Sequence, residues 1–210
     1  MSVTLVSGVN GVGLSSVCRA VRRGLGDGYK LINFGDVMLE QAATMGITTE
    51  RAQLGTLSQT ETRRLQRRAG EFVAREAATT NVILSTHLAV ETLEGYVQGL
   101  PVEVLDDVSP DAFVLVEADP ETVLERRREG DRDLGGVTER TIDFEQDLNR
   151  SAALQYARDQ NAPVRFIENE GELEDAAERG PTRGPAFPRS HVHLSSRTLS
   201  RGMYALARDA

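Results

Sequence analysis

The sequence contains a single cysteine, a single lysine and no long apolar run. Cys18 has no partner for an internal disulfide, which indicates a buried position and a reducing, cytoplasmic environment. Because no stretch of about 18 consecutive apolar residues occurs, we expect no membrane-spanning helix. The N-terminus leads directly into an apolar segment, so we expect no signal peptide either.

The chain has few lysines and also a negative net charge. Lys30 is the one lysine among 24 basic residues, which face 32 acidic residues and leave a net charge of −8. This balance argues against a nucleic-acid-binding protein, which would normally present a basic face. Arginine in place of lysine is typical of GC-rich genomes, and an acidic surface suits a salty cytoplasm.

A glycine-rich segment directly follows the first apolar run, residues 3–7. It consists of Gly8, Val9, Asn10, Gly11, Val12, Gly13, Leu14, Ser15 and Ser16. This spacing fits the phosphate-binding pattern G-x-x-x-x-G-K-[ST], except that Leu14 stands where the pattern has lysine. Backbone N–H groups of such a turn surround phosphate oxygens at a helix N-terminus, and the Ser15 hydroxyl would bind the magnesium of a nucleoside triphosphate.

Apolar runs alternate with segments of helical periodicity along the first 178 residues. We predict strands at residues 3–7, 30–34, 82–84, 112–116 and 164–167. We predict helices at residues 17–25, 35–45, 58–78, from Pro120, 138–160 and 172–178. Strands alternating with helices predict an α/β protein with a five-stranded parallel sheet and helices on both faces. Residues 88–101 lack clear periodicity and are predicted to form a long, functional loop.

Two arginine-rich segments allow alternative interpretations. The helix at 58–78 carries Arg63, Arg64, Arg67 and Arg68 away from its apolar face, which is typical of a solvated basic surface. Residues 126–133 hold a dense arginine run before Gly135 and Gly136, which fits either a mobile flap over phosphates or a solvated loop.

The composition changes after residue 178. Residues 1–178 carry 18 basic and 31 acidic side chains, whereas residues 179–210 carry six arginines and one acid. A disordered basic extension is one explanation. We favour another, in which the segment is read in a shifted frame of a GC-rich gene.

Residues 1 to about 178 resemble the archaeal type of adenylate kinase. The likeness rests on residues 7–13, 33–38, 64–66, 69–70, 86–87, 95–96, 99–101, 132–134, 149–150 and 152–153, in this order and spacing. The resemblance implies a P-loop kinase fold with a monophosphate-binding insertion at about 35–80 and an arginine-rich lid at about 126–138. It also implies a magnesium-dependent conversion of ATP and AMP to two ADP, and a homotrimer.

The resemblance further implies roles for individual residues. Gly8 to Ser16 would hold the ATP phosphates, with Ser15 at the metal. Gly35, Arg64, Thr86 and His87 would flank AMP. Arginines would surround the transferred phosphoryl group, and the candidates are Arg126, Arg127, Arg132 and Arg150. Besides Leu14, one position departs from the family pattern, since Ser85 stands where the family has an aspartate that organises magnesium through water.

Two further hypotheses remain open at this stage. The acceptor could be another nucleoside monophosphate or small molecule, because acceptor choice depends on the shape of a pocket. The protein could also be a nucleotide-binding regulator without turnover. Phosphoryl transfer needs positioning and charge neutralisation, so the arginines favour the enzyme over a pure binder.

Overall fold

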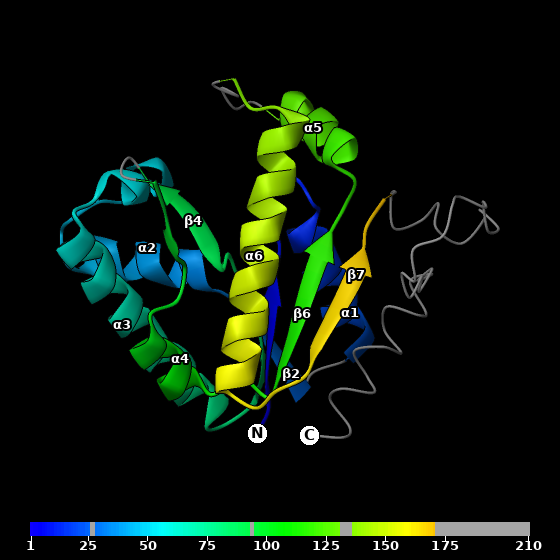
Figure 1. Cartoon of the computed structure of the whole chain (residues 1–210). Helices are drawn as coiled ribbons and strands as arrows, with labels where there is room; N and C mark the ends of the chain where they lie inside the picture. The colour runs from blue at the N-terminus through cyan, green and yellow to red at the C-terminus, as the bar shows by residue number, and fades with distance from the viewer. Residues whose placement is uncertain (26–27, 93–94, 131–135, 171–210) are drawn as a thin grey trace.

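The computed structural model describes residues 1–25, 28–92, 95–130 and 136–170. Within these residues, five parallel strands form the central sheet in the order β2-β3-β1-β6-β7 (Figure 1). The strands are β1 (Val3–Ser7), β2 (Tyr29–Asn33), β3 (Asn81–Thr86), β6 (Ala112–Glu117) and β7 (Val164–Glu168). The predicted α/β class and its five parallel strands are confirmed.

Helices cover both faces of this sheet. They are α1 (Leu14–Leu25), α2 (Phe34–Thr44), α3 (Gln59–Ala77), α4 (Val102–Val108), α5 (Pro120–Glu129) and α6 (Glu139–Asp159), with a short 3₁₀ helix, η2 (Arg51–Thr56). Figure 1 shows α6 in front of the sheet and α1 behind it. Every helix in the described part of the chain is too short or too polar to cross a bilayer.

The core forms on both sides of the sheet because successive strand residues point to opposite faces. Leu5 of β1 packs among residues of α2, α3, α4 and α6, whereas Val6 packs with residues of α1 and α5. The same alternation occurs in β3 and β6, so the three central strands are apolar on both faces. This double burial explains why these segments are apolar without strict alternation.

The register brings the ends of several strands to one edge. Ser7 pairs with Thr86 on one side and with Leu115 on the other. Because the carboxyl ends of parallel strands meet at the same edge, the segments that follow β1, β3 and β6 lie side by side. This edge is where the predicted site residues gather.

The prediction of a loop over residues 88–101 was wrong. The segment contains an antiparallel hairpin of β4 (Ala89–Thr92) and β5 (Gly95–Gln98), and α4 follows it. Gly95 has φ +115°, which suits the turn. The backbone of Gly99 lies so close to the carbonyl of His87 that a side chain would not fit. The hairpin therefore depends on Gly95 at its turn and on Gly99 at a close backbone contact, and the pattern of apolar residues does not predict it.

The predicted helix starts are partly confirmed. Ser58 and Glu61 form a capping box at the start of α3. Asp119 occupies the N-cap position of α5, but its side chain makes no capping hydrogen bond. The predicted helix at 172–178, the tail at 179–210 and Arg132 lie outside the described residues.

Candidate active site

The glycine loop connects β1 to α1 at the carboxyl edge of the sheet. Gly11 and Gly13 have φ +90° and +80°, values that glycine adopts without strain. A Cβ at Gly8 would lie 2.6 Å from the carbonyl oxygen of Val116 in β6. The loop therefore needs glycine at these positions, and it ends where the free N–H groups of the α1 N-terminus begin.

The residues that follow the last glycine differ in their surroundings. Leu14, at the position of the missing lysine, packs against the apolar cluster that contains Val17 and Val21. Ser15 is exposed in the first turn of α1. The Ser16 hydroxyl accepts a hydrogen bond of 3.2 Å from Nη2 of Arg19. Ser15 is therefore the hydroxyl available to a ligand at this turn.

Side chains from three other segments donate hydrogen bonds to the loop. The Nδ1–H of His87, just after β3, donates to the carbonyl oxygen of Gly8 at 2.6 Å. Nε of Arg127 in α5 donates to the carbonyl oxygen of Asn10 at 2.8 Å.

The third donor comes from the end of β7. Nδ2 of Asn169 donates to the carbonyl oxygen of Val12 at 2.7 Å. Together with His87 and Arg127, this contact fixes the loop from outside its own sequence.

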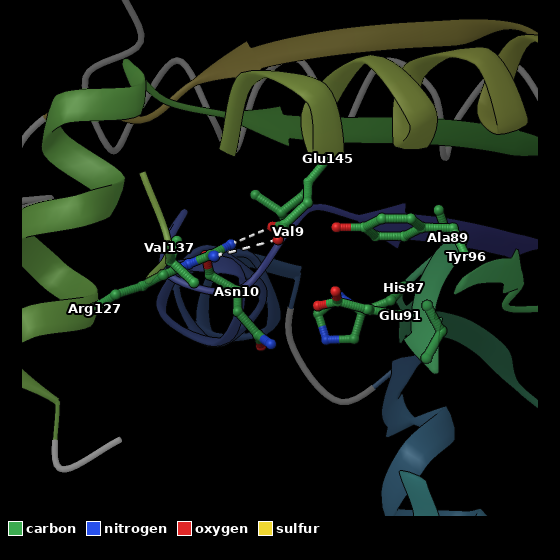
Figure 2. Close-up of a pocket in the computed structure, with 10 residues that line it drawn as sticks. Val9, Asn10, His87, Ala89, Glu91, Tyr96, Arg127, Val137 and Glu145 are labelled. Atoms are coloured by element: carbon green, nitrogen blue, oxygen red, sulfur yellow. Dashed lines mark hydrogen bonds and ion pairs between the residues drawn. The ribbon is translucent and has the colours of Figure 1, made fainter. Parts of the chain in front are cut away.

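Arg127 is also held by an ion pair. Its Nη2 lies 2.5 Å from Oε2 of Glu145 in α6, and the two side chains are only 11% and 14% exposed. Figure 2 shows this pair beside Asn10, with the Tyr96 ring from the hairpin directed toward it. Burial, followed by the charges of Glu145 and Glu91, raises the pKa of Tyr96, so the phenol stays neutral at pH 7.

These groups line a small pocket of about 290 Å³. Its walls include Val9 and Asn10 of the loop, His87, Tyr96, Arg127 and Glu145 (Figure 2). The structure thus brings members of three predicted groups together, since Val9 and Asn10 of the loop, His87 and Arg127 share one pocket. A guanidinium next to a glycine loop is suited to bind phosphate oxygens.

The other predicted arginines take part in different contacts. Nη1 of Arg126 donates to the carbonyl oxygen of Asn169 at 3.0 Å. Arg150 in α6 pairs with Glu117 at the end of β6 and with Asp147, at 2.9 Å and 2.5 Å. The hydrogen bonds to Glu117 are the main reason that the pKa of Arg150 is raised. Both arginines therefore lie near the carboxyl edge, in contacts within the protein.

A larger cavity lies between α3 and the hairpin. Its volume is about 1070 Å³, and Arg63, Arg64 and Arg67 of α3 line it together with Val97 and Pro101. Arg63, Arg64 and Arg67 are exposed and border this cavity. Because ligand pockets usually measure about 300–1,000 Å³, this cavity is large enough for a nucleotide.

The predicted residues Thr86 and Gly35 line neither of these two cavities. Thr86 ends β3 and is buried, and its hydroxyl donates to the carbonyl oxygen of its neighbour His87 at 3.4 Å. Gly35 lies in the first turn of α2, where a Cβ would come within 2.8 Å of Nη1 of Arg51. Arg51 in turn pairs with Asp36.

Sequence reasoning missed Glu145, Tyr96 and Asn169. Tyr96 belongs to one of the segments that carry the family resemblance, which was a usable signal. Glu145 and Asn169 lie in ordinary polar surroundings of a helix and a strand end, and their sequence context does not distinguish them. Among the described residues, no three His, Cys, Asp or Glu side chains gather as a potential metal cluster.

Comparisons with known proteins come from both sequence and structure. A family model described as AAA domain matches residues 7–143. The adenylate kinase of Pyrococcus abyssi is 38% identical over 168 residues, which cover 80% of this chain and 86% of that protein. The adenylate kinase of Methanothermobacter thermautotrophicus is 38% identical over 180 residues, which cover 84% of this chain and 95% of that protein.

Solved structures show the same fold at low sequence identity. Shikimate kinase from Bacteroides thetaiotaomicron superimposes with a TM-score of 0.60 at 17% identity, covering 99% of this chain and 98% of that one. A sugar kinase from Janibacter gives a TM-score of 0.51 at 15% identity, covering 100% of this chain and 96% of that one. The predicted P-loop kinase fold is confirmed.

Proposed function

Because the chain belongs to the adenylate kinase family, we propose that it transfers the terminal phosphoryl group of ATP to AMP and gives two ADP. The observation that carries this proposal is the glycine loop between β1 and α1, with the Arg127 guanidinium hydrogen-bonded to it. Loop and arginine supply the positioning and the charge neutralisation that phosphoryl transfer requires.

On the donor side, the loop would bind the triphosphate of ATP. Its glycines let the backbone turn where a Cβ would overlap neighbouring protein atoms, and the N-terminus of α1 adds a partial positive charge for the phosphates. Arg127 is positioned by Asn10 and by its ion pair with Glu145, and the N–H donors of its guanidinium that these contacts do not use would meet the phosphates. Arg126, Arg132 and Arg150 remain predicted contacts of the transferred phosphoryl group, and residues 126–138 remain the predicted lid.

On the acceptor side, the cavity beside α3 would hold AMP. Arg64, with Arg63 and Arg67, gives this cavity the positive charge that a monophosphate needs. His87 contacts Gly8 of the loop, lines the pocket beside the loop and follows Thr86 at the end of β3. Gly35, Thr86 and His87 remain the proposed flanks of AMP, and residues 35–80 remain the proposed monophosphate-binding insertion.

The residues present fit a magnesium ion bound together with ATP. Magnesium is usually held by one or two protein oxygens, with phosphate oxygens and water completing its shell. Ser15 offers its exposed hydroxyl on the first turn of α1, two positions after Gly13 of the glycine loop. When bound, the ion would neutralise negative charge on the phosphates. A cytoplasmic homotrimer is the assembly that the resemblance implies, and it stays a prediction.

The test is ADP formation from ATP and magnesium with AMP, CMP, UMP or GMP as acceptor, at low and high potassium chloride. We expect turnover with AMP and little with the other three. Preferred turnover of another acceptor would replace the proposed substrate. ATP binding without turnover of any acceptor, at either salt concentration, would favour a regulator and overturn the proposal.

A further inference from the structure

Alternate carbonyl groups of the glycine loop are each held by a side chain from another segment. The carbonyl oxygens of Gly8, Asn10 and Val12 accept from His87, Arg127 and Asn169. The resemblance to the family leads one to expect His87 and Arg127 near the substrates. It says nothing of Asn169, which lies 157 positions from Val12 in the sequence.

Asn169 is itself fixed by its backbone. Its N–H donates to the carbonyl oxygen of Glu117 at 2.8 Å, which continues the pairing of β7 with β6. Its carbonyl oxygen accepts from Nη1 of Arg126 at 3.0 Å. The side-chain amide therefore starts from a rigid position at the end of the sheet, and it reaches the loop from there.

The direction of the Val12 carbonyl matters for anion binding. A phosphate site needs N–H groups that converge on the anion, and a carbonyl oxygen turned toward it would repel it. Val12 immediately precedes Gly13, whose φ of +80° turns the chain into α1. A donor that captures the Val12 oxygen therefore holds this turn in the form that presents amides to the phosphates.

We propose that Asn169 is a positioning residue for phosphate binding, because its side-chain amide holds the Val12 carbonyl of the glycine loop away from the anion. The inference rests on the proposed function, since it concerns the same ATP site. It assigns Asn169 to the triphosphate part of ATP, acting through the loop, and to neither the adenine base nor the acceptor.

Two variants and a matched control test this assignment in the full-length chain. Asn169→Ala and Asn169→Leu both remove the amide donor without adding charge, and the leucine keeps a similar volume. Asn81→Ala is the control, because Asn81 is also partly buried and hydrogen-bonded but lies at the amino end of β3, with Ser2 and Gly28 as partners. All proteins are measured well below their melting temperatures.

The readouts are the Kd values of ATP, inorganic tripolyphosphate and adenosine, the KM of AMP and the melting temperature. Since one hydrogen bond is lost, we expect the Kd of ATP and tripolyphosphate to rise about 3- to 10-fold in both Asn169 variants. The Kd of adenosine and the KM of AMP should not change. Asn81→Ala should lower the melting temperature without changing any of the binding constants.

Two results would overturn the inference. One is a tripolyphosphate Kd that stays within about 1.5-fold of the wild-type value in both variants. The other is a change confined to adenosine and ATP, which would place Asn169 at the base. Failure of the proposed function is distinguishable, because it would appear in the wild-type protein as absent ADP formation, whereas this inference depends on the ratio of variant to wild-type Kd.

Discussion

Replacement of Gly13 by alanine adds one methyl group where the glycine loop meets α1, and we expect it to remove most of the ATP affinity. Gly13 has φ +80°, a conformation that residues with a Cβ rarely adopt. Its added Cβ would also fall on Nδ2 of Asn169, the atom that donates to Val12. The methyl group therefore strains the backbone at Gly13 and displaces the Asn169 side chain that holds the loop.

The size of the effect follows from these two contacts. A left-handed conformation costs a residue other than glycine about 1–2 kcal/mol. Displacement of the Asn169 amide forfeits a hydrogen bond worth about 0.5–1.5 kcal/mol. The variant can relieve both by letting the loop leave its anion-binding form, and ATP binding must then restore that form. The two costs add to about 1.5–3.5 kcal/mol, so at about 1.4 kcal/mol per factor of ten the Kd of ATP should rise about 10- to 300-fold.

Isothermal titration with ATP measures this change directly, with Gly28→Ala as the matched control. Gly28 also lacks a side chain, but a Cβ there meets nothing within 4 Å and its φ is not in the left-handed range. Gly28→Ala should therefore leave the Kd unchanged. A Gly13→Ala protein that binds ATP within about twofold of wild type would refute the reasoning. Adding Asn169→Ala to Gly13→Ala should cost less than its effect alone, because the steric overlap is gone.

Three further variants test other parts of the structure. Arg127→Ala should lower kcat for ADP formation at least ~100-fold, and an effect on KM alone would contradict its proposed role. Gln146→Ala leaves the buried N–H and C=O of Ala118 without their partner, so urea denaturation should show a loss of about 2–4 kcal/mol; a loss near zero would speak against this. Burial raises the pKa of Tyr156 to about 12, whereas an unfolded tyrosine ionises near 10. Its contribution to stability is therefore complete below pH 10 and lost as the pH rises to 12, and Tyr156→Phe should decline less steeply over that range.

The parallel sheet and the position of the loop could be predicted from the sequence because both depend on local patterns. Strands such as 3–7 and 112–116 are buried on both faces, so apolar residues occur at consecutive positions and the runs stand out. The glycine spacing from Gly8 to Gly13 follows from the conformation of the loop itself. Such signals lie within one short segment of the chain.

The hairpin and the supports of the loop could not be predicted because they depend on contacts distant in sequence. β4 and β5 carry exposed and partly buried residues, so burial leaves a weak pattern on them. Glu145 acts through Arg127, 18 positions away, and Asn169 through Val12, 157 positions away. A glutamate in a polar helix and an asparagine after a strand are common, and the fold alone gives them their partners.

Leu14, at the position where the phosphate-binding pattern has lysine, can be explained by the different origins of the loop conformation and of its hydrogen-bond donors. Its side chain packs on the core beside α1 and cannot donate a hydrogen bond. Glycine spacing fixes where the loop amides can point, and no other residue type meets that demand at Gly13. Positive charge and donors, in contrast, can reach a loop from any neighbouring element, and here Arg127 reaches it from α5. The glycines are therefore the part of the motif that must stay in place, whereas we propose that its cation is supplied from another segment.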